Sequence, residues 1–202
     1  MVGEGAPYAT IALVVAGCAG WVLIRGGYLG AIHVPGVGSI AGQYVSFFKV
    51  AIGGPLNGDW WKLLSSPFAY LNGWYAFVAL LACAIFGWLL ERRHGPVFVL
   101  VVFFGGAVTG ALAALAVYAE PIVSGANGGA LALLGAWSVP DLRAARHGYY
   151  YEGDLLGVAA IAAVLLLTPY ARPEASWLAG VVGLALGLVL GVGMLLFEPA
   201  EA

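Results

Sequence analysis

The sequence predicts an all-α integral membrane protein, a single domain over residues 1–202 that folds as a bundle of six membrane-spanning helices. Composition is the first observation behind this prediction: 62% of the 202 side chains are hydrophobic and 9% are charged, whereas soluble domains carry about a quarter charged residues. The second observation is that the charged residues are bunched, which leaves long apolar stretches between them. Because about 20 apolar residues cross a bilayer, these stretches leave no room for a sizeable aqueous domain.

Each apolar stretch predicts one helix, and residues 25–67 form a long outer loop. Within that loop, residues 26–48 are also uncharged, but His33, Pro35, Gln43 and several glycines make them a poor spanning helix. The fourth and fifth helices are short for a bilayer, and we expect them to sit below one surface. The six helices are expected at about residues 8–24, 68–90, 97–118, 126–139, 155–168 and 177–197.

The arginines predict the orientation in the membrane. Arg92, Arg93, Arg143 and Arg146 lie between helices two and three and between helices four and five, whereas the two opposite short connections hold only Arg172. Positive charge marks cytoplasmic loops, so both termini are expected in the cytoplasm, in a plasma membrane. The abundance of Ala and Gly, with few lysines relative to arginines, is typical of a GC-rich bacterial genome.

Charge placement narrows the function classes. A net charge of −2 offers no basic face, which excludes nucleic-acid binding as a main activity. Glu91, Asp141 and Asp154 lie at helix ends, so the mid-membrane charge expected of a transporter or pore is missing, and we disfavour that class. The histidines show no metal-site spacing, and we expect neither a metal nor a cofactor. The three histidines are His33, His94 and His147, and Cys18 and Cys83 are read as packing residues.

Glycines predict close helix packing. The chain has 31 of them, and they recur at helical spacing in Gly106-xxx-Gly110 and in Gly183-xxx-Gly187-xxx-Gly191. Small residues four apart let helix backbones approach each other in lipid, so the pattern favours a tight bundle.

Several local patterns follow one another along the chain and together resemble the rhomboid family of intramembrane serine proteases, over roughly residues 8–197. The resemblance implies a six-helix rhomboid-like bundle. The patterns are GDWWKLL at 58–64, then Phe68, Tyr70 and Tyr75, GWLLERRHG at 87–95, GANGGALALLGA at 125–136 and the glycine-stepped last helix.

Rhomboid chemistry requires a serine hydroxyl, a histidine that accepts its proton, and donors for the oxyanion. The residue that matches the nucleophile of the family's Gly-x-Ser-Gly motif is Asn127, between Gly125 and Gly128. An amide is not a comparable nucleophile.

The family's catalytic histidine also has no counterpart. Its position matches Ser176 if Gly183 and Gly187 set the register, or Trp177 if Gly180 does. No histidine follows His147 in the chain, so neither register supplies the base.

In the second helix, the family's oxyanion-hole histidine and asparagine match Tyr75 and Ala79, and another histidine position matches Tyr70. The scaffold signals persist beside these replacements. Trp61 and Lys62 keep the first-loop element with Lys in place of Arg, which loses the planar fork of donors. We interpret Trp61, Lys62, Glu91, Gly183 and Gly187 as structural residues.

These replacements predict a catalytically silent rhomboid-like protein. Its resemblance to inactive members of the rhomboid superfamily implies that it binds transmembrane segments of client proteins, with those helices and the lipid bilayer as its partners. The alternative is a rhomboid-type serine endopeptidase, for which Ser124, Ser65 or Ser66 would have to supply the nucleophile. Asn127 has two interpretations. Its amide caps helix four and bonds across to Tyr75 or Trp177, which we favour, or it contacts a bound helix.

Overall fold

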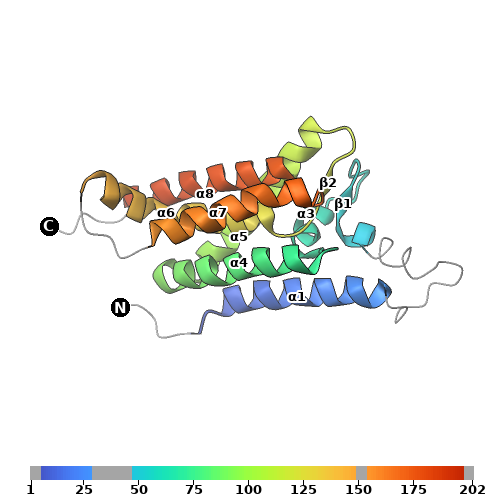
Figure 1. Cartoon of the computed structure of the whole chain (residues 1–202), viewed down its shortest axis with the longest axis horizontal. Coiled ribbons are helices and arrows are strands. Elements are labelled where there is room, and N and C mark those ends of the chain that lie inside the picture. Colours follow the sequence, from blue (N-terminus) through green and yellow to red (C-terminus); the bar gives the residue numbers. More distant parts are fainter. Residues whose placement is uncertain (1–5, 29–46, 149–153, 198–202) are drawn as a thin grey trace, which may run out of the picture.

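The computed structural model describes residues 6–28, 47–148 and 154–197. Six long helices run roughly along the length of the molecule, and two short strands lie at one end (Figure 1). The long helices are α1 (Tyr8–Tyr28), α4 (Gly73–His94), α5 (Pro96–Val117), α6 (Asn127–Arg146), α7 (Leu155–Ala171) and α8 (Trp177–Phe197). The short elements are β1 (Ile52–Gly53), α3 (Lys62–Ser65), η1 (Ser66–Phe68) and β2 (Ile122–Val123).

The predicted helical membrane class is confirmed. Among the described residues, four helices are long and apolar enough to cross a membrane, namely α1, α4, α5 and α8. Helix α7 is apolar but shorter, and α6 ends in charged residues. The count of six spans therefore stays a prediction.

Two helices, α4 and α6, differ most from their predicted bounds, each for a local reason. Helix α4 begins at Gly73 because the Asn72 side chain caps it, accepting hydrogen bonds from the backbone N–H groups of Trp74 (2.9 Å) and Tyr75 (3.1 Å). Helix α6 continues through Pro140 to Arg146 and is therefore not short. Proline usually ends a helix, but here the polar residues after Pro140 continue the helix to Arg146.

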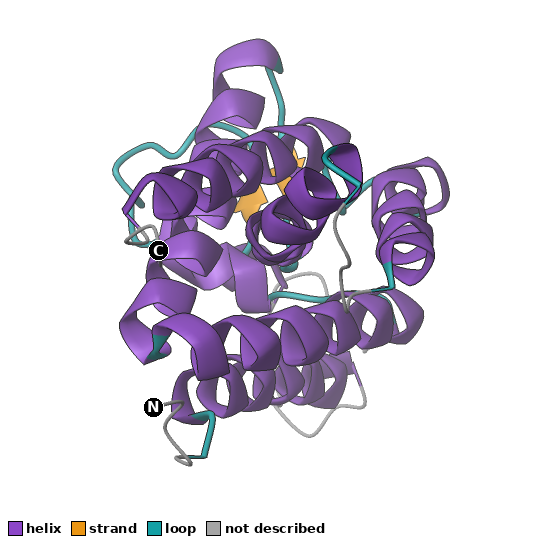
Figure 2. Ribbon diagram, turned by 90° about the vertical axis from the view of Figure 1, so that its left-hand side faces the viewer, coloured by secondary structure: helices purple, strands orange, loops and turns teal. Residues whose placement is uncertain are grey.

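The predicted outer loop, residues 25–67, includes regular structure in its described part. Strand β1 pairs antiparallel with β2, with Ile52 opposite Val123 and Gly53 opposite Ile122. Seen along the bundle in Figure 2, this strand pair lies at the far end, behind the helices. This strand pair ties the loop to the segment that leads into α6. His33, Pro35 and Gln43 lie outside the described residues.

Helix α6 is the core of the bundle, since its residues 127–136 are all buried. Helix α8 lies directly against it through glycine. A Cβ atom at Gly183 would collide with the backbone oxygen of Gly128, and one at Gly187 would collide with that of Ala132. Helix α5 packs similarly, because a Cβ at Gly110 would lie 2.6 Å from the Ala179 oxygen. The predicted glycine stripes therefore mark real backbone contacts.

The four arginines used for the orientation prediction lie at one end of the molecule. Helix α1 begins there, α4, α6 and α8 end there, and the α4–α5 turn lies there too (Figure 1, left). Asn127, at the start of α6, lies at the opposite end. A helix of 20 residues spans about 30 Å at 1.5 Å per residue, so these two ends are about one bilayer thickness apart.

Candidate functional site

The segment that leads into α6 is held by hydrogen bonds from three parts of the chain. The Gly54 N–H donates to the Pro121 oxygen (2.9 Å), and the Gly125 N–H donates to the Ser66 oxygen (2.8 Å). From the other side, the Ser124 N–H donates to the oxygen of Glu174 (3.0 Å), just before α8. The outer loop and the α7–α8 connection thereby fix the position of the first turn of α6.

Gly125 is required by its backbone. Its φ is +69°, and a Cβ there would lie 2.5 Å from the Tyr75 ring. Left-handed φ and the absence of side-chain space both favour glycine. The first glycine of the GANG motif is therefore explained by the turn that presents Asn127.

Tyr70 and Tyr75 are fully buried beside this turn. The Tyr75 hydroxyl donates to the Ser124 oxygen (2.9 Å), and the Tyr70 hydroxyl accepts from the Ala126 N–H (3.2 Å). Their rings meet edge to face with centroids 5.4 Å apart, and Ala79 is buried one turn along α4 from Tyr75. The two phenols thus take up backbone hydrogen bonds at the entrance of α6 and fill the space there.

Asn127 is the first residue of α6 and is 2% exposed. Neither its Oδ1 nor its Nδ2 has a hydrogen-bond partner among the described residues. Our favoured interpretation of Asn127, a cap bonded to Tyr75 or Trp177, is therefore wrong. The Tyr75 hydroxyl instead donates to the Ser124 oxygen.

The α8 residue that faces Asn127 is Gly180, which sequence reasoning missed. A Cβ at Gly180 would lie 2.7 Å from Asn127 Nδ2. Ser176, one turn earlier, instead starts α8: its Oγ accepts a hydrogen bond from the Ala179 N–H (3.3 Å). Trp177 is about half exposed. The available signal was the helical spacing, since Gly180 follows Ser176 by one turn on the same face.

Glu91 ties two helices together at the arginine end. Its carboxylate accepts hydrogen bonds from the Ala9 N–H (2.9 Å), the Thr10 N–H (2.7 Å) and the Thr10 hydroxyl (2.7 Å). A carboxylate at a helix N-terminus satisfies its free N–H groups and favours the helix dipole. Glu91 thus caps α1 from the end of α4.

Trp61 is exposed and Lys62 is partly buried beside it, at the start of α3. Lys62 Nζ is 2.9 Å from the Asp59 carboxylate and 5.8 Å from the centre of the Trp61 ring, and Trp61 is about half exposed. Neither side chain reaches Asn127 in the contacts the structure gives. Among the described residues, no group of three or more His, Cys, Asp or Glu side chains could hold a metal ion.

A family model described as the Rhomboid domain matches residues 57–197. The chain belongs to the rhomboid family. A comparison with curated proteins found no match. The rhomboid match begins in the outer loop, so helix α1 precedes it, and the match includes the whole site around Asn127.

The histidines of this rhomboid chain do not supply a base near Asn127 within the described residues. His94 ends α4 and His147 follows α6, both at the arginine end, about 30 Å away along a 20-residue helix. His33 lies outside the described residues.

Proposed function

We propose that this rhomboid is catalytically silent and binds transmembrane segments of client membrane proteins without cutting them. The proposal is carried by one observation: the residue at the nucleophile position, Asn127, is a buried amide with no hydrogen-bond partner among the described residues. A buried polar group without a partner in a native structure calls for an explanation. A ligand that forms the missing hydrogen bonds is one such explanation.

The surroundings of Asn127 support the absence of hydrolysis. Gly180, the α8 residue opposite it, has no side chain and so offers no base. The phenols of Tyr70 and Tyr75 already bond to the backbone of the turn before α6. An oxyanion needs donors that are free and aimed at it, and the Tyr75 hydroxyl already donates to the Ser124 oxygen.

The alternative is a serine endopeptidase that uses a different serine. Ser124 is the nearest candidate in sequence, and it is 1% exposed, with its hydroxyl donating to the Glu174 oxygen (3.2 Å). Ser65 donates to the Val50 oxygen (2.9 Å). A hydroxyl that donates to a backbone carbonyl is not activated by a base, so the silent form is favoured.

Client binding has support in the packing of α7. Of the α7 residues, all of which the structure describes, Leu165 alone is buried. Leu156 and Leu167 are more than half exposed. A helix held by so little buried surface is the one most easily displaced, and a client helix that replaces its contacts would approach the first turn of α6.

Asn127 supplies the polar part of this recognition. A buried amide left without partners costs about 1–3 kcal/mol, which a client recovers if its own backbone bonds to that amide. A helix that is locally unwound exposes such backbone groups, whereas a regular helix has none free. We therefore propose a preference for helices interrupted by glycine or proline, in a plasma membrane with both termini of this chain in the cytoplasm.

The first experiment is a cleavage assay in liposomes with a rhomboid-type transmembrane substrate. The natural chain and Asn127→Ala are expected to leave it intact. The matched gain-of-function variant is Asn127→Ser with Gly180→His, because residue 180 is the one that faces residue 127. Cleavage by the natural chain that disappears in Asn127→Ala or Ser124→Ala would establish the endopeptidase instead.

The second experiment measures binding directly, by energy transfer in liposomes between the labelled chain and two labelled single-span peptides, one with a central Gly-Pro break and one of uninterrupted leucine. We expect tighter binding of the broken helix, and loss of that preference in Asn127→Leu. The control is Ser138→Ala, because Ser138 is also buried in α6 but bonds within its own helix, to Gly135 (3.0 Å). Equal binding of both peptides by the natural chain would contradict the proposal.

A further inference from the structure

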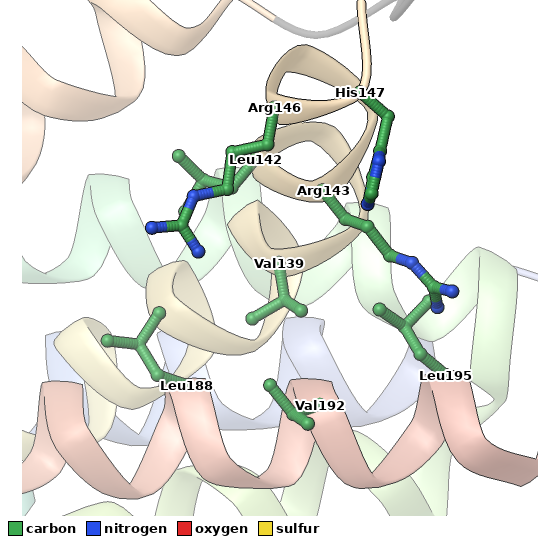
Figure 3. A pocket seen from close by; sticks show the side chains of 8 residues that line it. All are labelled: Val139, Leu142, Arg143, Arg146, His147, Leu188, Val192 and Leu195. Atoms are coloured by element: carbon green, nitrogen blue, oxygen red, sulfur yellow. The ribbon is translucent and has the colours of Figure 1, made fainter. Parts of the chain in front are cut away.

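A cavity lies at the arginine end of the bundle, between the last turns of α6 and the second half of α8. Its volume is about 630 Å³, within the range of roughly 300–1,000 Å³ typical of ligand pockets. Eight side chains line it, drawn in Figure 3: Val139, Leu142, Arg143, Arg146, His147, Leu188, Val192 and Leu195. It is at the other end of α6 from Asn127 and does not belong to the site described above.

The walls of this cavity are aliphatic. Val139 forms its base on α6, and Leu188, Val192 and Leu195 face it from α8 (Figure 3). Helix α8 is one of the four candidate spans, and Val192 is half exposed, so this face of α8 is open to its surroundings. In a bilayer those surroundings are hydrocarbon, and an acyl chain fits such a wall without any polar group to satisfy.

The rim of the cavity is basic. Arg143 and Arg146 extend to opposite sides of it in Figure 3, and the eight lining residues include no acidic side chain. Asp141 is the acidic residue nearest in sequence on the same helix, and α8 has no charged residue between Trp177 and Phe197. Arg143 and Arg146 lie about one turn apart on α6, and each guanidinium group offers the planar, bidentate bonding that phosphate oxygens accept.

We propose that this cavity binds an anionic phospholipid, with an acyl chain along α8 and the headgroup phosphate between Arg143 and Arg146. Its position supports a membrane lipid rather than a soluble anion, because the apolar walls continue directly from a basic rim at the end of a membrane-spanning bundle. Basic pockets between helices at the cytoplasmic surface bind acidic headgroups in this way. The proposal does not depend on client binding.

The test uses the full chain in neutral detergent, titrated with phosphatidylglycerol, phosphatidylcholine or inorganic phosphate, with bound lipid measured by native mass spectrometry. We expect phosphatidylglycerol to bind more tightly than phosphatidylcholine. The double variant Arg143→Gln with Arg146→Gln is expected to weaken phosphatidylglycerol binding about thirtyfold. This corresponds to about 1 kcal/mol of attraction to the acidic headgroup for each arginine removed. Phosphatidylcholine binding is expected to stay unchanged.

The matched control is Arg92→Gln with Arg93→Gln, which removes two exposed arginines from the same end of the molecule but outside the cavity. It is expected to retain phosphatidylglycerol binding. Val192→Phe, which fills the groove and keeps both arginines, is expected to weaken it. Equal binding of the two lipids, equal loss in both arginine pairs, unchanged binding in Val192→Phe, or binding of inorganic phosphate as tight as that of the lipid would each overturn the proposal.

Discussion

The two ends of the bundle differ in whether a buried polar side chain is hydrogen-bonded. At the arginine end, Glu91 is 8% exposed and accepts three hydrogen bonds from α1. At the other end, Asn127 is 2% exposed and has no partner among the described residues. Both residues stand at a helix terminus of the same rhomboid scaffold, so the difference between them is one of hydrogen bonding and not of burial.

This difference separates a residue that stabilises the fold, Glu91, from a residue that does not, Asn127. A charge can be buried only when it is bonded, and Glu91 meets that condition through the first turn of α1. The neutral amide of Asn127 is buried without such bonds, and its desolvation lowers the stability of the fold. Residues that support structure gain stability from their partners, whereas residues kept for binding often reduce it.

The largest expected effect comes from breaking the α6–α8 contact that places Asn127 opposite Gly180. In Gly187→Leu, the new side chain meets the backbone of Ala132, which cannot move aside. Overpacking costs about 3 kcal/mol or more when backbone must shift, so we expect little folded protein. Thermal unfolding in detergent measures it. Gly193→Leu, on the same helix with nothing within 4 Å of its Cβ, is expected to unfold like the natural chain, and equal loss in both would contradict the close contact.

The next effect sharpens the Glu91 side of the comparison. Glu91→Ala leaves the Ala9 N–H, the Thr10 N–H and the Thr10 hydroxyl without their acceptor. Bonds to a charged group contribute about 1.5–3 kcal/mol each, of which water recovers part, and we expect a loss of about 3 kcal/mol. Glu91→Gln keeps one acceptor oxygen and is expected to lose less. Equal unfolding free energies for Glu91→Ala and the natural chain would show that α1 is not held by this cap.

Much of this architecture could be predicted from the sequence, because composition and glycine spacing act locally. The helical membrane class and the backbone contacts of Gly183 and Gly187 follow from such patterns. The boundary at Asn72 was missed, since a cap depends on one side chain and not on hydropathy. Gly180, the α8 residue that faces Asn127, was missed because the register between two helices is a tertiary property, which motif counting left open between Ser176 and Trp177.

Asn127→Leu has the opposite expected sign to Glu91→Ala. Leucine has the same number of side-chain heavy atoms as asparagine, branched at the same position, and removes two buried polar atoms that have no partner. We expect the unfolding free energy to rise by about 1–2 kcal/mol, since no hydrogen bond is lost and a desolvation cost disappears. Chemical unfolding in detergent, beside Ser138→Ala, measures it. A loss of stability in Asn127→Leu would mean that the amide is bonded in the native protein and would remove the contrast between the two ends.

The smallest effect concerns the two phenols that surround Asn127. Tyr75→Phe removes the hydroxyl that donates to the Ser124 oxygen and leaves the ring in place against Gly125. A neutral hydrogen bond contributes about 1 kcal/mol, so we expect that loss in unfolding free energy, and Tyr170→Phe, at a position 80% exposed, is expected to show none. The Tyr75→Phe variant also frees the Ser124 oxygen beside the site. If the Tyr75 hydroxyl only holds the turn before α6, the variant is expected to keep the preference for the broken peptide. A changed preference would assign Tyr75 to client recognition together with Asn127, and the polar end of the bundle would then have two binding residues in place of one.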